Sequence, residues 1–352
     1  MPASVALKDV LKTYAVEGEI CESLEDGKVR CYACGHRCLI LPGLDGICRV
    51  RFNDAGKLMV PAGYVGALQC DPVEKKPFFH AYPGSLALTF GMLGCDLHCA
   101  YCQNWVTSQA LRDPAAVALP QHVTPEQMAD IARRQGARLL VSSYNEPLIT
   151  SEWAVSIFKE AKAKGLVCAF VSNGNATPEV LDYIRPWVDL YKIDLKSFND
   201  RNYRKLGGVL QNILDTIKMV HERGFWLEIV TLVIPGFNDA PDEIKAAAEF
   251  IAGVSPEIPW HVTAFHQDYK MTGPNNTSVE TLLRAAEIGR QAGLKFVYAG
   301  NIPGRLGKNE DTFCPECNTS VVERLGFRIL KNRLKGSRCP KCDATIPGHW
   351  GS

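Results

Sequence analysis

From residue 86 onward, short apolar runs alternate with longer segments in which apolar residues recur at helical spacing. Strands that alternate with helices form parallel sheets, and strands that are apolar throughout are buried on both faces. We therefore expect an α/β protein built on a partial barrel of six strand–helix units, or on an extended version of it. The predicted strands are residues 86–91, 138–144, 167–172, 189–195, 226–234, 260–265 and the less regular run 295–299.

The segments between these runs carry helix start and stop signals. Thr124 precedes Pro125 and stands three residues before Gln127, which predicts an N-cap, a proline in the first turn and a capping box. Thr177 and Pro178 repeat the start signal. Glycines stand where four of the helices should end, at Gly136, Gly165, Gly224 and Gly293.

The two ends of the chain differ from this repeating middle. Residues 1–85 are rich in glycine and proline and show only a short helical pattern near 4–16, so we expect a largely irregular appendage. We predict three parts: a cysteine-rich N-terminal appendage (1–85), a β/α barrel (86–305) and a C-terminal zinc ribbon (306–352).

Length and charge narrow the class of protein. The 352 residues, 46% of them hydrophobic, are enough for one barrel with small additions. Lys plus Arg (39) almost equals Asp plus Glu (38), so net charge points to neither a polyanion nor an acidic membrane surface. No apolar run reaches the roughly 18–20 residues of a membrane span, and residues 1–19 lack the pattern of a signal peptide. We expect a cytoplasmic protein.

Eleven of the fourteen cysteines fall into three groups. In a reducing compartment such groups indicate metal sites, because disulfides do not persist there. Cys21, Cys70 and Cys168 stand alone and are expected to be small buried side chains.

The middle group, Cys95, Cys99 and Cys102, directly follows the first predicted barrel strand. Four thiolates close a [4Fe–4S] cluster, whereas three leave one iron open to another ligand. The competing interpretation is a zinc site of these three thiolates and His98.

Polar residues also follow the later strands, and strand ends of a barrel meet at one mouth. Taken singly, each has an ordinary explanation. Glu146 could be a carboxylate favoured by a helix N-terminus, and Asp194 or His266 a satisfied polar group at a strand end. Together they predict one site. Its members at the strand ends are Asn145, Glu146, Ser172, Asn173, Asp194, Lys196 and His266.

The other two cysteine groups each supply four thiols. Cys314, Cys317, Cys339 and Cys342 form two C-x2-C pairs with the spacing of a zinc ribbon, whose default role is structural. Basic residues between 331 and 341 leave docking to a protein or RNA open, although we do not expect a nucleic-acid partner. Cys31, Cys34, Cys38 and Cys48 could bind zinc or a second, closed [4Fe–4S] cluster, with zinc narrowly favoured.

The motifs resemble a known family. The C-x3-C-x-aromatic-C form, with Tyr101 as the aromatic residue, is similar to the radical S-adenosylmethionine (SAM) superfamily. The wider set resembles the radical SAM enzyme of the AmmeMemoRadiSam systems, which is related to the pyruvate formate-lyase activating enzymes of glycyl-radical enzymes. The motifs that carry this resemblance are RCYACGHRC, GICRVR, DPVEKKPFFH, GCDLHCAYCQNW, SYNEPLI, SNG, DLK, VIPGFND, FHQDYKM, CPEC and CPKC.

The resemblance implies a role for each site residue. Cys95, Cys99 and Cys102 would bind the [4Fe–4S] cluster, and the backbone near Tyr101 would contact the adenine of SAM. Glu146 would accept a hydrogen bond from the SAM ammonium group, while Asn145 stands where the family usually has glycine. Ser172 and Asn173 would contact the ribose or carboxylate, and Ile234 would belong to an apolar wall over the adenine. Asp194 and Lys196 match a D-x-K element near the cofactor and, with His266 and Tyr269, are candidates to face the substrate.

The implied activity is reductive cleavage of SAM to a 5′-deoxyadenosyl radical, which abstracts hydrogen from an unidentified substrate. Flavodoxin or ferredoxin would supply the electron, and Memo-like and Ammecr-like proteins would be partners. Two alternatives stay open: an activating enzyme that acts on a backbone glycine of a partner protein, and a metal-bearing scaffold that binds RNA or protein.

Overall fold

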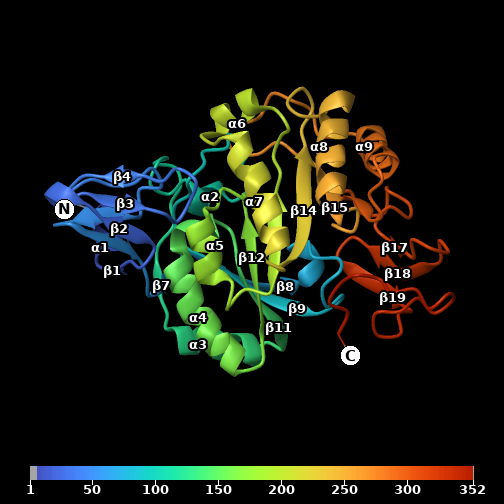
Figure 1. The fold of residues 1–352 in the computed structure, drawn as a ribbon, viewed down its shortest axis with the longest axis horizontal. Helices are drawn as coiled ribbons and strands as arrows, with labels where there is room; N and C mark the ends of the chain where they lie inside the picture. Colours follow the sequence, from blue (N-terminus) through green and yellow to red (C-terminus); the bar gives the residue numbers. More distant parts are fainter. Residues whose placement is uncertain (1–5, 352) are drawn as a thin grey trace.

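The computed structural model describes residues 6–351, and its main feature is one sheet of eight strands (Figure 1). The strand order is β16-β15-β14-β13-β12-β11-β9-β8, and neighbours from β9 to β16 are parallel. All seven predicted strands are confirmed within a few residues. They are β9 (Leu86–Gly91), β11 (Ala137–Ser142), β12 (Val167–Ser172), β13 (Leu190–Asp194), β14 (Trp226–Val233), β15 (Trp260–Ala264) and β16 (Val297–Gly300).

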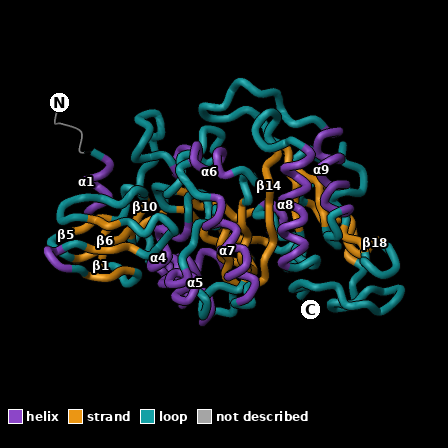
Figure 2. The backbone as a smooth tube through the Cα atoms, turned by 45° about the horizontal axis from the view of Figure 1, so that its top comes forward, coloured by secondary structure: helices purple, strands orange, loops and turns teal. Residues whose placement is uncertain are grey.

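Helices connect these strands and run alongside the sheet (Figure 2). The predicted capping box is present: Gln127 N donates to Thr124 Oγ1 at 3.2 Å, and Thr124 N donates to Gln127 Oε1 at 2.9 Å. Thr177 caps the next predicted start by accepting from Val180 N. The helices are α2 (Trp105–Ser108), α3 (Pro125–Arg134), α4 (Ser151–Ala163), α5 (Pro178–Ile184), α6 (Asp200–Leu206), α7 (Leu210–Glu222), α8 (Pro241–Val254) and α9 (Val279–Gln291), with a 3-10 turn at Pro147–Thr150.

Close packing fixes the helices against the sheet. Trp260 of β15 is fully buried, and its indole N–H donates to Thr231 Oγ1 at 3.0 Å. A Cβ at Gly289 of α9 would lie 2.8 Å from the Trp260 ring, so only glycine lets this helix approach so closely. Burying one large apolar side chain contributes roughly 1.5–3 kcal/mol, and the core holds dozens of them.

The prediction that residues 1–85 are largely irregular is wrong. This segment forms two small antiparallel sheets, β1-β6-β5 and β2-β3-β4. The helix expected near residues 4–16 is present but shorter, spanning Leu7–Lys12, because strand β1 begins at Ala15. Residues 4 and 5 lie outside the described part of the chain. Apart from β6 and β8, these strands are two or three residues long, too short to show a period in sequence. They are β1 (Ala15–Glu17), β2 (Cys21–Ser23), β3 (Val29–Cys31), β4 (Leu39–Ile40), β5 (Phe52–Asp54), β6 (Lys57–Pro61), β7 (Tyr64–Val65, paired with β10, Gln121–His122) and β8 (Ala67–Pro72), with helix α1 (Leu7–Lys12) and 3-10 turns at Glu25–Gly27 and Val73–Lys75.

Strand β8 of this segment belongs to the central sheet, where it pairs antiparallel with β9. The sheet is therefore mixed, and residues upstream of 86 contribute one of its edges. In the described part of the chain, the helices are all too short or too polar to cross a membrane.

The C-terminal residues form a third small sheet, β17-β18-β19. Its strands are β17 (Thr312–Phe313), β18 (Ser320–Leu325) and β19 (Arg328–Asn332). The chain then returns to the segment that precedes β9, where His349 N donates to His80 O at 2.7 Å. The C-terminal sheet therefore covers one end of the central sheet next to residues 79–82 (Figure 1).

Candidate active site

The loop after β9 carries Cys95, Cys99 and Cys102, and close backbone contacts hold it in place. A Cβ at Gly91 would lie 2.4 Å from Ser143 O, so the end of β9 can pass the end of β11 only as glycine. Gly94 has a φ of 94°, a conformation that L side chains rarely adopt. The sequence around the first cysteine thus fixes the path of the loop.

The three cysteines face a small cavity of about 90 Å³ at the carboxyl ends of the parallel strands. The structure brings most of the predicted site residues to this cavity. Its lining includes Cys95, Cys99, Cys102, Asn145, Glu146, Ser172, Asn173, Asp194 and Lys196. Three thiols with adjacent carboxylate, hydroxyl and amide groups suit an iron–sulfur cluster beside a polar, charged ligand. This donor set fits a [4Fe–4S] cluster and SAM.

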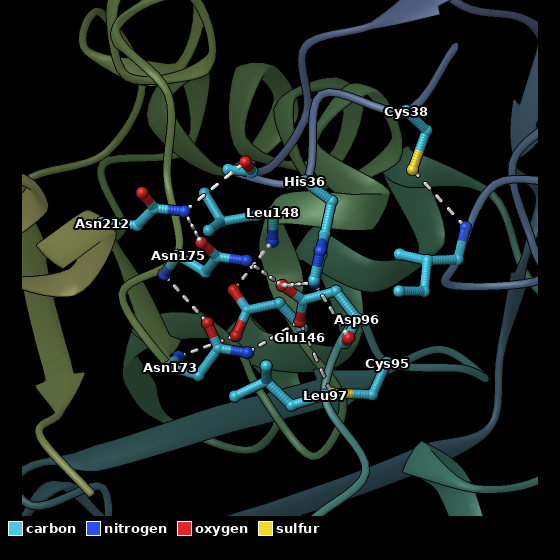
Figure 3. A network of polar contacts seen from close by, with 12 residues as sticks. His36, Cys38, Cys95, Asp96, Leu97, Glu146, Leu148, Asn173, Asn175 and Asn212 are labelled. Carbon is cyan, nitrogen blue, oxygen red and sulfur yellow. Dashed lines mark hydrogen bonds and ion pairs between the residues drawn. The ribbon is translucent and has the colours of Figure 1, made fainter. Parts of the chain in front are cut away.

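Glu146 is the centre of a buried hydrogen-bond network (Figure 3). Its carboxylate accepts from Ser172 Oγ and from the backbone N–H of Asn173, both at 2.7 Å, and from Leu148 N at 3.1 Å. Burial, followed by the negative charge of Asp96, raises the pKa of Glu146 despite these donors. A bound cation would stabilise the carboxylate form.

Asp96, between the first cysteine and Leu97, is fully buried beneath the same cavity. Its two carboxylate oxygens accept from Asn173 Nδ2 at 2.7 Å and from Asn175 Nδ2 at 2.8 Å. The cysteine loop is therefore tied to the end of β12 by two side-chain hydrogen bonds.

Asp194, at the end of β13, lies between two lysines. Lys192 Nζ donates to Asp194 Oδ1, and Lys196 Nζ donates to Oδ2 at 3.4 Å. Although burial opposes ionisation, the two lysines hold the pKa of Asp194 below its usual range. The trio carries a net positive charge next to Cys99, a place where an anionic group of a substrate or cofactor would be stabilised.

A larger cavity of about 480 Å³ shares Cys99, Cys102, Asp194 and Lys196 with the small one. This volume lies in the range of ligand-binding cavities. The wall combines groups from all parts of the chain: Lys76 and Phe79 from the N-terminal segment, Tyr101, His261 and Tyr298 from the sheet and its loops, and Glu310 and Phe327 from the C-terminal part.

The DPVEKKPFFH segment forms one side of this cavity. Glu228 of β14 is fully buried and accepts from the backbone N–H groups of Phe79 and His80, both at 2.9 Å. Its Oε2 also contacts His261 Nε2 at 2.7 Å. A single buried carboxylate thus fixes the cavity wall to the sheet.

Three residues singled out from the sequence lie elsewhere. His266 lines neither cavity, and its Nε2 accepts from Gln103 Nε2 at 3.0 Å. Tyr269 donates to Asp113 Oδ2 at 2.7 Å and stacks on Trp105, away from the cavities. Ile234 is buried in an apolar cluster with Tyr101 and Cys99, beside the cavity rather than on its surface.

Sequence reasoning missed Asp96, Asn175 and Lys192. Lys192 had a detectable signal, because a lysine in the otherwise apolar run 189–195 must find a partner when it is buried. Asp96 and Asn175 had none, since neither stands in a periodic pattern and their contact joins positions 79 residues apart.

The C-terminal cysteines Cys314, Cys317, Cys339 and Cys342 converge on one point. Their sulfur atoms all lie within 4.8 Å of one another, with pairs at 3.5 and 3.6 Å. Zn–S bonds of about 2.3 Å in tetrahedral geometry place sulfurs roughly 3.8 Å apart. Hydrogen bonds from Thr319 lower the pKa of Cys317 to about 6, whereas burial raises the pKa of Cys314. This group can bind a metal ion.

Comparisons with known proteins agree with this site. Residues 90–251 match the Radical SAM superfamily. An uncharacterized protein of Methanocaldococcus jannaschii is 34% identical over 329 residues, which cover 92% of this chain and 97% of that protein. The pyruvate formate-lyase 1-activating enzyme of Escherichia coli is 25% identical over 233 residues, 61% of this chain and 93% of that enzyme.

Solved structures with similar folds include a radical SAM methyltransferase from Sphaerobacter thermophilus, with a TM-score of 0.49 and 18% identity over 65% of this chain and 70% of that one. A domain of a pyruvate-formate lyase-activating enzyme from Bacteroides vulgatus has a TM-score of 0.41 and 25% identity, over 46% of this chain and 98% of that one.

The chain belongs to the radical SAM superfamily. It is an enzyme, related to activating enzymes of glycyl-radical enzymes, rather than a catalytically inactive scaffold.

Proposed function

We propose that this enzyme cleaves SAM reductively at a [4Fe–4S] cluster held by Cys95, Cys99 and Cys102 and abstracts hydrogen from a substrate in the adjoining cavity. One observation carries the proposal: the three thiols line the same small cavity as Glu146, Asn173 and Asp194. When bound, the cluster and SAM supply a 5′-deoxyadenosyl radical. The chain's own residues bind the two groups, orient the reacting atoms and shield the radical from solvent.

Glu146 is the residue best placed to bind the ammonium group of SAM. Its pKa is raised by burial, so a nearby cation lowers the cost of keeping it ionised. Ser172 and Asn173 hold both carboxylate oxygens in a fixed orientation, which reduces the entropy lost on binding. Tyr101 and Ile234, in the buried apolar cluster, are assigned to the adenine side.

Asp194 and Lys196 line both cavities, so they stand between the proposed cofactor position and the proposed substrate position. We assign them to orienting the reacting groups. His266, which lines neither cavity, is left without a catalytic role in this proposal.

Further assignments follow from the sequence motifs and the donor sets. The central sheet and its helices would form an open, partial radical SAM barrel, and Cys314, Cys317, Cys339 and Cys342 would hold a structural zinc ion in a ribbon. The enzyme would act in the cytoplasm with flavodoxin or ferredoxin as electron donor. The assignment to an AmmeMemoRadiSam system, with Memo-like and Ammecr-like partners, rests on the motifs alone.

Activation of a glycyl-radical enzyme is the second candidate, favoured by the likeness to activating enzymes. The large cavity instead favours a small molecule over a segment of a partner protein as the substrate, because two residues of the C-terminal part, Glu310 and Phe327, contribute to its wall. A glycine-bearing peptide with the sequence of a glycyl-radical loop separates the two: an activating enzyme would place a radical on it.

The test uses anaerobically reconstituted enzyme with SAM and dithionite. We expect a [4Fe–4S] absorption band and formation of 5′-deoxyadenosine. Cys99→Ala should weaken the absorption band and abolish 5′-deoxyadenosine, whereas the control Cys70→Ala should keep both. Deuterium transfer from labelled substrate pools into 5′-deoxyadenosine would then identify the substrate. Absence of 5′-deoxyadenosine from wild-type enzyme that carries the cluster would refute the proposal.

A further inference from the structure

The N-terminal cysteines gather around the small sheet β2-β3-β4. Cys31 ends strand β3, and its backbone N–H donates to Cys38 O at 2.9 Å. Cys31, Cys34 and Cys48 are buried, and Cys38 is half-buried. The four thiols thus come from the two loops on either side of β4, and Cys38 is the one that is partly exposed.

The spacing of these thiols differs from that of the C-terminal group. Among residues 6–351, only the C-terminal cysteine group brings three or more ligand atoms of His, Cys, Asp or Glu within 4.8 Å of one another. The N-terminal four are spread more widely, as are Cys95, Cys99 and Cys102. In a [4Fe–4S] cluster each thiolate binds its own iron, so the sulfurs stand farther apart than around one shared zinc.

A buried arginine stands beside these thiols. Arg51 is 1% exposed, and Glu152 accepts from both of its terminal nitrogens at 2.7 Å. Arg51 stands three residues after Cys48, and its carbonyl accepts from Gly46 N at 2.8 Å, so its backbone belongs to the loop that carries Cys48. The Arg51 Nε–H is buried without an acceptor within the described residues. Buried N–H groups without a partner are rare, and cluster sulfurs accept such hydrogen bonds.

The two cysteine loops of the N-terminal half contact each other directly. Arg112 donates from Nη1 to Cys95 O at 2.7 Å and from Nη2 to Ile47 O at 2.6 Å, so one guanidinium joins both loops. A Cβ on Gly94 would lie 3.2 Å from Cys48 O.

A second connection runs through Asp96 (Figure 3). His36, two residues after Cys34, places Nε2 3.2 Å from Asp96 O. Asn175 accepts from Gly35 N at 2.8 Å and donates to Asp96 Oδ2 at 2.8 Å. Residues next to Cys34 therefore meet residues next to Cys95 without a solvent layer between the loops.

We infer that Cys31, Cys34, Cys38 and Cys48 bind a second [4Fe–4S] cluster, closed by four thiolates, that delivers single electrons to the cluster at Cys95, Cys99 and Cys102. This inference departs from the narrow preference for zinc drawn from the spacing in sequence. A low-potential one-electron donor protein reduces the second cluster from the 2+ to the 1+ state and is itself oxidised by one electron. The same electron then moves to the first cluster, and the second returns to 2+. The binding of the second cluster stands independently, whereas its relay role rests on the proposed function.

Metal content tests the binding without touching the four cysteines. The full-length triple variant Cys95→Ala/Cys99→Ala/Cys102→Ala removes the first site and leaves the second. After anaerobic reconstitution we expect about four iron atoms and four sulfides per chain and, on reduction, the paramagnetic signal of a [4Fe–4S] cluster. The wild type should hold about eight iron atoms. A triple variant with no iron and two bound zinc ions, one of them at the C-terminal group, overturns the inference.

The relay is tested in Cys34→Ala, with Cys21→Ser as its control. Cys21 lies opposite Cys31 on the neighbouring strand, but its thiol donates to Gly18 O at 3.7 Å and is not one of the four. Cys34→Ala should keep about four iron atoms. With dithionite, Cys34→Ala should form 5′-deoxyadenosine as the wild type does. With a reduced flavodoxin or ferredoxin as donor, it should form 5′-deoxyadenosine at least tenfold more slowly than the wild type.

Equal rates for Cys34→Ala and wild type with the protein donor would exclude a relay. Failure of the proposed function looks different, because wild-type enzyme would then give no 5′-deoxyadenosine even with dithionite. Circular dichroism of both variants checks that the fold is retained, and the iron count of the triple variant stays decisive if Cys34→Ala does not fold.

Discussion

Asn173 donates a hydrogen bond from Nδ2 to Oδ1 of Asp96 at 2.7 Å, while its backbone N–H donates to Glu146 at the same distance. One residue at the end of β12 thus positions both Glu146, the carboxylate proposed to bind SAM, and Asp96, the residue that follows Cys95. The bond is buried and charged, so its loss is costly.

Asn173→Ala should weaken SAM binding roughly tenfold or more, because a hydrogen bond to a charged group contributes about 1.5–3 kcal/mol. Calorimetric titration of reconstituted enzyme measures the affinity. The control is Gln211→Ala, which removes an amide–carboxylate bond of similar length to Asp215 on the surface of α7. Unchanged affinity in Asn173→Ala would show that this network does not organise the cofactor site.

Asp194→Asn should destabilise the fold by roughly 2 kcal/mol, because Lys192 and Lys196 lose their shared counter-ion. The cost is below that of a fully buried pair, since a third of the Asp194 side chain is exposed. Adding Lys192→Met should recover part of the loss by removing one of the two cations. Urea unfolding of the wild type, Asp194→Asn and the double variant measures these free energies of unfolding. If the second substitution added a further loss, Asp194 and Lys192 would not be coupled.

Glu152→Gln should cost about 3–5 kcal/mol, because Arg51 would keep a buried charge without its carboxylate. Glu17→Gln is the control: Glu17 pairs with Lys57 at 2.8 Å, but both side chains are about 60% exposed. It should change stability little, because solvent screens such pairs. The midpoints of urea unfolding measure the loss of stability in each variant. Similar shifts of the midpoint in both variants would contradict a stabilising role for the buried ion pair.

Removing zinc should loosen the C-terminal sheet first. Four thiolates that share the proposed zinc ion would hold β17 and β18 to the loop around Cys339, and this small part has little core of its own. We expect about one zinc per chain that a strong chelator extracts, followed by protease cleavage between residues 312 and 345. Cys339→Ser should be cleaved without chelator. Resistance of the metal-free wild type would mean that packing alone maintains this sheet.

Acid should weaken the contact that His80 makes between the segment before β9 and the C-terminal part of the chain. Burial lowers the pKa of His80 to about 4, and its ring contacts Pro347 O at 2.7 Å and Tyr298 OH at 2.6 Å. The unfolded chain, with an ordinary histidine pKa near 6.5, binds the proton more readily. The resulting stabilisation, about 3 kcal/mol, is complete above pH 6.5 and is lost as the pH falls towards 4.

Urea unfolding of wild type and His80→Gln at pH 7 and pH 4.5 measures this effect. The variant should be less stable at pH 7 but lose less on acidification. Identical pH dependence in both proteins would assign the acid sensitivity to other groups.

The parallel strands and helix caps could be predicted because their signals are local. Thr124 and Gln127 lie within one turn, and the apolar runs show burial residue by residue. The meeting of Glu146, Asn173 and Asp194 was also predictable, since carboxyl ends of parallel strands share one edge. The roles of Asp96, Glu228 and strand β8 were not, because each depends on contacts between distant segments that no local period encodes.

The wall of the large cavity has a consequence for how the enzyme is made. His80 finds its partner Pro347 only 267 positions later in the chain. On the ribosome, residues 79–82 must wait while the parallel strands are synthesised and begin to pack. Until residues 310–327 are synthesised, they cannot close their side of the large cavity, whose wall includes Cys99 and Cys102. The assembly machinery that delivers iron and sulfide would therefore meet an open vestibule, and late closure would protect what it has delivered.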